Sequence, residues 1–216
     1  MDVSELKALI SEGENFKIEF KRQFSSIEKI AKELIAFANT KGGMILFGVD
    51  DDGTICGVES EKSEMDLLYE AAHEYCEPPI EPIVQVIELN RKDVVVAIIK
   101  ESETKPHRLQ DYKDYLSKDS KVYIRINDKS VVASREVVKI LQGESPDSEP
   151  LSIIIGENER RLFKYLEDNE RITVKDFAKL VNISERRASR TLVNLVRAGV
   201  IRIHTEERLE YFTSAF

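Results

Sequence analysis

The chain has 216 residues, of which 42% are hydrophobic and 33% charged, and its formal net charge is −8. This length allows one large or two small domains with buried cores, and the acidic balance excludes a protein coated in positive charge. The longest aliphatic run, residues 94–99, is far shorter than the roughly 20 residues of a membrane helix, so we expect no membrane contact. No secretion signal opens the chain, and the two cysteines form no CxxC pair, so we expect a cytoplasmic protein.

Charge is unevenly distributed along the chain. Residues 151–216 carry 12 Lys and Arg against 10 Asp and Glu, a net charge of +2. Residues 1–150 carry 20 against 30, a net charge of −10. This difference indicates two domains with different partners.

The first predicted elements are a short helix at residues 3–11 and a strand at residues 16–21. In the strand, apolar and polar residues alternate, as in a half-buried strand. Ser25 and Glu28 have the spacing of a capping box. The apolar residues that follow, up to Ala38, recur at helical spacing and predict a helix that faces the core.

Residues 37–53, FANTKGGMILFGVDDDG, form the organising stretch of the first domain. Gly42 and Gly43 predict the end of the helix and a reversal of the chain. Residues 44–49 are almost wholly apolar, as expected for a strand covered on both faces. The DDG turn predicts a hairpin with residues 54–58.

The rest of the first domain alternates between helical and strand patterns. A helix at residues 61–76 ends before a pair of prolines, and strands at 83–89 and 94–99 flank a four-residue loop. A further strand at 121–126 precedes a last helix at 134–141. We therefore predict an α+β fold with a mixed, mostly antiparallel sheet and helices on one face.

Residues 10–141 contain six short motifs in a fixed order: IEFK at 18–21, FANTKGG at 37–43, FGVDDDG at 47–53, PPI at 78–80, KPH at 105–107 and YIR at 123–125. Together these motifs resemble the Schlafen AlbA-type DNA-binding domain. The family was once catalogued as a divergent AAA ATPase domain, and its prokaryotic members are usually called predicted transcriptional regulators. The chain departs from the family after YIR, where residues 127–130 are NDKS and the family usually has Gly-Ser.

The former ATPase assignment makes an ATP- or nucleotide-binding protein one alternative. A phosphate-binding P-loop needs GxxxxGK[ST]. Gly43 and Gly48 have the glycine spacing, but Val49 and Asp50 follow where Lys and Ser or Thr should stand. A weaker contact between a phosphate and the loop around Lys41 stays open.

A metal-dependent nuclease that acts on RNA or single-stranded DNA is the second alternative. Some relatives cleave RNA with two glutamates around the IEFK strand and a further aspartate. The resemblance therefore implies Glu14, Glu19 and Asp50 or Asp52 as candidate catalytic residues. Such carboxylates could hold Mg²⁺ or Mn²⁺ and activate water. In the alternative interpretation, Glu19 pairs with a neighbouring lysine and the aspartates only form a turn. We favour this interpretation and therefore expect no enzymatic activity, no bound metal and no cofactor.

The resemblance also places basic residues of several segments near one groove of the first domain. Candidate phosphate contacts are Lys21, Lys41, Lys105, His107 and Arg125. Such groups can follow a nucleic-acid backbone without reading bases. The alternative is a solvated sheet face whose charge is balanced by nearby acids.

Residues 142–152 lack large apolar side chains over most of their length and predict a linker between domains 1–141 and 153–216. The second domain shows three helical patterns, at residues 157–166, 175–181 and 185–198, and a terminal hairpin at 200–212. This order resembles a winged helix-turn-helix domain of bacterial transcription factors.

The third helix and the hairpin of this domain supply the candidate DNA contacts. They are Arg186, Arg187, Ser189, Arg190 and Asn194 on the helix, and Arg202, His204 and Arg208 on the wing. Arginines on such a helix can bind guanine in the major groove. We therefore predict a cytoplasmic DNA-binding transcriptional regulator, acting as a homodimer. The remaining alternative is a winged helix that docks on proteins.

Overall fold

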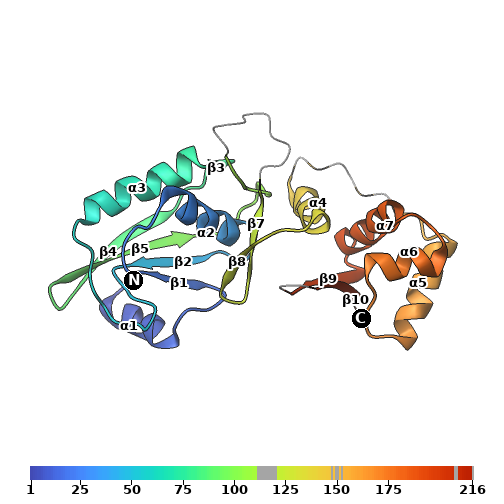
Figure 1. Cartoon of the computed structure of the whole chain (residues 1–216), viewed down its shortest axis with the longest axis horizontal. Coiled ribbons are helices and arrows are strands. Elements are labelled where there is room, and N and C mark those ends of the chain that lie inside the picture. Colours follow the sequence, from blue (N-terminus) through green and yellow to red (C-terminus); the bar gives the residue numbers. More distant parts are fainter. Residues whose placement is uncertain (111–120, 147, 149–150, 152, 207–208, 216) are drawn as a thin grey trace. The chain divides into compact units, whose positions relative to one another are not determined.

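The computed structural model of the chain describes residues 1–110, 121–146, 148, 151, 153–206 and 209–215. These residues form two compact units, Met1–Ala133 and Ser134–Phe216 (Figure 1). Each unit has its own hydrophobic core and is described separately below. No helix in the described part of the chain is long and apolar enough to cross a membrane.

A four-stranded sheet forms the centre of the first unit. Its strands are β1 (Ile18–Lys21), β2 (Gly43–Phe47), β5 (Lys92–Ile99) and β4 (Ile83–Leu89), in the order β1-β2-β5-β4. Strands β1 and β2 are parallel, whereas β2–β5 and β5–β4 are antiparallel. The prediction of an α+β fold with a mixed, mostly antiparallel sheet is confirmed.

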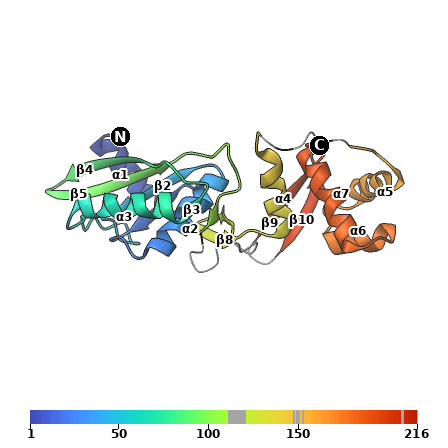
Figure 2. The same ribbon diagram turned by 90° about the horizontal axis from the view of Figure 1, so that it is seen from above.

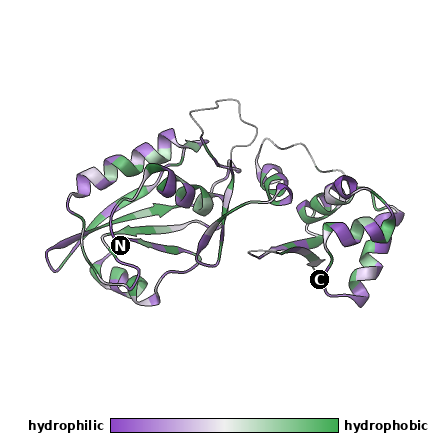
Figure 3. Cartoon of the chain, viewed as in Figure 1, coloured by the Kyte–Doolittle hydropathy of each residue, from purple (hydrophilic) through white to green (hydrophobic). Residues whose placement is uncertain are grey.

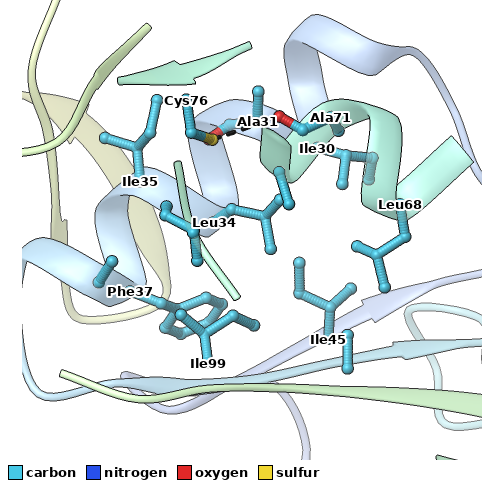
Figure 4. Close-up of a cluster of buried hydrophobic side chains, with 14 of the residues drawn as sticks. Ile30, Ala31, Leu34, Ile35, Phe37, Ile45, Leu68, Ala71, Cys76 and Ile99 are labelled. Carbon is cyan, nitrogen blue, oxygen red and sulfur yellow. Dashed lines mark hydrogen bonds between the residues drawn. The ribbon is translucent and has the colours of Figure 1, made fainter. Parts of the chain in front are cut away.

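Helices cover both faces of this sheet. α2 (Ile27–Asn39) and α3 (Glu61–Glu74) pack on one face, where Leu34, Ile45 and Leu68 share a core (Figure 4). α1 (Val3–Glu12) packs on the other face with Leu6 (Figure 2). Side chains alternate along a strand, so β2 contributes to both cores. The expectation of helices on one face omitted α1, because its short apolar pattern does not reveal which face it covers.

Figure 3 shows the same arrangement in terms of hydropathy. Strands β2 and β5 are coloured as hydrophobic, whereas α3, above them, has a hydrophilic side and a hydrophobic side. The expectation that residues 44–49 are covered on both faces agrees with the two cores that meet at β2.

The glycine pair after α2 is required by close backbone contacts. Gly42 has φ +66°, and a Cβ atom there would lie 2.6 Å from the carbonyl oxygen of Ile99. At Gly43 a Cβ atom would lie 2.3 Å from the Phe37 ring and 2.8 Å from the carbonyl oxygen of Lys17. Only glycine therefore fits where β2 enters the sheet between β1 and β5.

Local pairing differs from the prediction at two turns. After β2, the DDG turn closes with only one bridge, between Val49 and Ile55, because β2 pairs with β5 instead of residues 54–58. Between β4 and β5, Asn90 and Arg91 both have positive φ and form a two-residue turn in place of the expected four-residue loop. Two short pairs complete the unit: β3 (Cys76–Glu77) with β6 (Arg108–Leu109), and β7 (Tyr123–Ile126) with β8 (Lys129–Val132).

The second unit contains four helices and a hairpin within the described residues. They are α4 (Arg135–Glu144), α5 (Glu157–Asp168), α6 (Val174–Val181), α7 (Glu185–Arg197), β9 (Ile201–Thr205) and β10 (Glu210–Ser214). Leu162, Phe177, Leu192 and Phe212 lie in one apolar core that joins α5, α6, α7 and the hairpin. This order and packing are those of a winged helix.

Helix α4 belongs to this second unit. The sequence placed it as the last helix of a first domain that ended at residue 141, but in the structure α4 packs against α7. The two units therefore divide between Ala133 and Ser134, before the predicted linker. The amphipathic pattern of α4 predicts the helix but does not reveal which core it covers.

Candidate nucleic-acid interface

A tight turn connects α6 to α7. Asn182 adopts the left-handed conformation, with φ 55°, and ends α6. Ser184 then begins α7, because its hydroxyl accepts a hydrogen bond from the backbone amide of Arg187 at 3.3 Å. Three residues thus separate the two helices, as in a helix-turn-helix.

Helix α7 is held in place by its apolar side. Ala188, Leu192 and Leu195 are buried in the core of the unit. Arg186, Arg187 and Arg190 are exposed to solvent on other sides of the helix. The structure therefore presents these three predicted DNA contacts on a rigid element.

Ser189 and Asn194 are less accessible than these arginines. Ser189 is only 4% exposed; its hydroxyl donates a hydrogen bond to Glu136 of α4 and accepts one from Lys139 Nζ at 3.4 Å. Asn194 is half-buried. With α4 in this position, Ser189 does not face solvent.

The hairpin β9–β10 forms the wing. Arg202 is exposed on β9. His204 stacks on Tyr211 with ring centroids 5.0 Å apart, and its Nε2 lies 2.9 Å from the hydroxyl of Thr213. These contacts join the two strands, so His204 has a structural role in the hairpin. The predicted contact Arg208 lies outside the described residues.

In the first unit, Arg125 lies in a buried ionic network. Its side chain is 0% exposed and donates hydrogen bonds of 2.9 Å to both Glu19 and Glu33. Ser130 also donates to Glu33, and Lys21 pairs with Glu19. Burial raises the pKa of Glu33, and the negative charge of Glu19 acts in the same direction. Arg125 and Lys21 are therefore engaged by carboxylates.

The candidate nuclease carboxylates serve separate local roles. Glu14 accepts a hydrogen bond from a backbone amide of β1 at 2.9 Å, and burial raises its pKa. Asp50 lies 3.6 Å from Arg22, and Asp52 accepts from a backbone amide of its own turn at 2.8 Å. Within the residues that the structure describes, no group of three or more His, Cys, Asp or Glu side chains is arranged to hold a metal ion.

The other basic candidates of this unit surround Glu101 and Asn39. Glu101 pairs with exposed Lys41 at 3.2 Å and with buried Lys105 at 2.6 Å. His107 is 2% exposed, and its backbone amide donates to Asn39 Oδ1 at 2.7 Å. Burial lowers the pKa of His107. Lys41 is thus the most accessible of the predicted phosphate contacts in this unit.

The loop that was considered for nucleotide binding uses its amides internally. The amides of Thr40 and Gly42 donate to the carbonyl oxygen of Phe37, at 3.1 and 3.0 Å. The amide of Met44 donates to the carbonyl oxygen of Lys17 at 2.8 Å. These amides end α2 and join β2 to the preceding strand, so they do not form an open nest for phosphate.

Sequence reasoning missed several residues that the structure places beside the candidates. In the first unit they are Glu33 and Ser130, which bind Arg125; in the second they are Glu136 and Lys139 of α4. In the sequence Arg125 alternates with apolar residues, which predicts a solvent-facing side chain, so its burial and its acidic partners follow only from the fold. Nothing in the α4 sequence pointed to α7.

Comparison with known proteins finds a different family in each of the two units. Residues 14–134 match the family described as Schlafen, AlbA_2, and residues 156–202 match winged helix-turn-helix DNA-binding domains. A search of curated proteins gives no match.

Two solved structures are similar to part of the chain. The DIP2311 protein from Corynebacterium diphtheriae is 16% identical, with a TM-score of 0.46, over 69% of this chain and 34% of that one. The N-terminal domain of a RecG-related protein from Nitrosomonas europaea is 21% identical, with a TM-score of 0.44, over 62% of this chain and 96% of that one. The chain thus spans about a third of the Corynebacterium protein. On the family matches, the chain belongs to the Schlafen, AlbA_2 family and carries a winged helix-turn-helix DNA-binding domain after that region.

Proposed function

We propose that the chain is a cytoplasmic, DNA-binding transcriptional regulator whose helix α7 reads the major groove. The observation that carries this proposal is the exposure of Arg186, Arg187 and Arg190 on a helix anchored in its own core. A major groove about 12 Å wide admits one helix, and arginine binds both acceptors of a guanine edge. Such residues near the start of the second helix of the motif are well placed for base contacts.

The wing supports a second contact in the same complex. Arg202 is exposed on β9, beside the His204–Tyr211 stack that stiffens the hairpin. A cation on a rigid hairpin can bind the phosphate backbone or the minor groove next to the site that α7 occupies. Arg202 would then add affinity with little dependence on sequence.

We further propose that the protein binds DNA as a homodimer. One winged helix contacts few bases, whereas two copies related by a twofold axis read two half-sites.

The cytoplasmic location that we propose is supported by the cysteines. Cys56 and Cys76 are both free thiols, as expected in a reducing cytoplasm.

The test is a selection of bound duplexes from a random pool, performed with the full chain at two stated salt concentrations. We expect an enriched motif with two inverted half-sites about 10 base pairs, or a multiple of that, apart. Sedimentation of the complex gives the number of copies bound. A motif with one half-site and one bound copy would contradict the dimer, and a selection without any enriched motif would contradict sequence-specific binding.

A further inference from the structure

Helix α4 covers one side of α7. Glu136 and Lys139 of α4 both bind the hydroxyl of Ser189, and Ser134 at the start of α4 donates to Glu210 of β10 at 2.7 Å. Val193 is 4% exposed, yet it is not part of the core that joins α5, α6, α7 and the hairpin. α4 packs on α7, and the two helices lie side by side in both views (Figures 1 and 2). Val193 lines a cavity that residues of both helices share.

A basic cavity of about 410 Å³ lies between these two helices. Among the residues that line it are Lys139 and Gln142 of α4 and Arg186, Arg190, Asn194 and Arg197 of α7. No described lining residue is a carboxylate. Within the described part of the chain, Lys139, Arg186 and Arg190 form no ion pair. Lys139 contacts the hydroxyl of Ser189, which also binds Glu136.

We propose that this cavity binds a small phosphate-bearing ligand. Its volume lies within the range of about 300–1,000 Å³ that small-molecule sites occupy. Phosphate oxygens accept charge-assisted hydrogen bonds from guanidinium and ammonium groups, and arginine can bind them in a bidentate manner. The ligand binds cationic side chains of both helices and thereby holds α4 against α7.

The site suits a small ligand and not a DNA duplex, because it is a cavity of about 410 Å³ between α4 and α7. Arg186 and Arg190 line this cavity, and both are also proposed to contact DNA. Ligand binding in the cavity and DNA binding through these two arginines are therefore alternatives. This regulatory consequence rests on the proposed function, whereas the binding site itself does not.

The first experiment titrates the full chain with pyrophosphate in a calorimeter at constant ionic strength. We expect saturable binding that weakens about tenfold in Lys139→Gln, because one charge-assisted contact is lost. Lys179→Gln removes a lysine from the exposed side of α6, outside the cavity, and leaves the affinity unchanged. Absence of binding, or equal binding by Lys139→Gln and the native chain, would overturn the proposal.

A second variant changes the cavity without removing a charge. Gly143 lies within α4 at an ordinary helical φ, so alanine is compatible with the helix. A Cβ atom there would lie 2.0 Å from Arg197 Nε and must displace that flexible side chain. We expect Gly143→Ala to weaken pyrophosphate binding while helix content stays the same; unchanged affinity would contradict the location of the site.

The third experiment adds pyrophosphate to the protein–DNA complex at matched ionic strength and measures the release of DNA. We expect release of DNA from the native chain and a smaller release from Lys139→Gln. If DNA does not bind at all but pyrophosphate binds through Lys139, the proposed function fails and the cavity site stands. If pyrophosphate does not bind alone and Lys139→Gln weakens DNA binding, the cavity is a contact for the DNA backbone and the small-ligand proposal fails.

Discussion

The two units use arginine in opposite ways. In the first unit, Arg125 is fully buried between Glu19 and Glu33. In the second, Arg187 is exposed on α7 and has no ion-pair partner among the described residues. Both residues were candidate nucleic-acid contacts in the sequence, where they looked alike.

The difference shows what each arginine can do. A guanidinium that already binds two carboxylates stabilises the fold and cannot bind a phosphate unless those contacts break. An exposed guanidinium on a fixed helix keeps its donors free for a partner. Mutation should therefore change stability in the first unit and DNA affinity in the second.

The largest effect is expected for Arg125→Met. This change leaves the buried carboxylates of Glu19 and Glu33 without their partner, and we expect a loss of about 3–5 kcal/mol in the free energy of unfolding of the first unit. Hydrogen exchange at the amides of β2 and β5 measures this change in the free energy of unfolding. The control Arg22→Met breaks an exposed pair of 3.6 Å with Asp50 and should change stability by less than about 1 kcal/mol. Similar losses in both variants would contradict a structural role specific to Arg125.

The next effect is on DNA affinity in Arg187→Ala. If Arg187 binds a base edge, the variant should lose about 1–3 kcal/mol of binding free energy for the selected motif, with unchanged thermal stability. Gel shifts of the full chain measure the change. Arg160→Ala is the matched control, since it removes an exposed arginine of α5. Equal affinity of both variants and the native chain would exclude Arg187 as a base contact.

The sequence predicted much of this architecture because periodic patterns report on local structure. The alternation predicted at 16–21 and the helical stripe predicted at 27–38 depend only on which residues face a core, and the structure contains β1 at Ile18–Lys21 and α2 at Ile27–Asn39. The predicted N-cap of α2 was wrong by one residue: the hydroxyl of Ser26, not that of Ser25, accepts a hydrogen bond from the backbone amide of Lys29. Neighbouring serines offer the same hydroxyl, and the fold selects between them.

Partners that are distant in sequence could not be predicted in this way. Arg125 meets Glu19 across 106 positions, and Lys139 meets Ser189 across 50. These contacts depend on how the elements pack, and an alternating or helical pattern contains no such information. The basic candidates of the first unit therefore looked accessible in the sequence, while the structure engages most of them with acids or in the core.

A smaller effect is expected from the pH dependence of Glu33→Gln. Burial and the charge of Glu19 raise the pKa of Glu33 above 4.5. A carboxyl whose pKa is raised on folding contributes stability that is present below its unfolded pKa and is lost as pH rises through the folded value. The stability of the native chain minus that of Glu33→Gln should therefore fall as pH rises from 4.5 towards neutrality. Urea unfolding across this range measures it; a difference that stays constant or rises would contradict the assignment.

The smallest effect is expected for Lys41→Ala. Lys41 is 69% exposed and pairs with Glu101 at 3.2 Å, and Glu101 keeps its contact with buried Lys105. An exposed pair of this kind contributes at most about 1 kcal/mol, so the unfolding midpoint in urea should barely change.

The Lys41→Ala variant also tests whether Lys41 takes part in DNA binding. A phosphate contact by Lys41 would reduce the slope of log affinity against log salt concentration by about 1, equally for selected and random duplexes. An unchanged slope would exclude Lys41 as a phosphate contact.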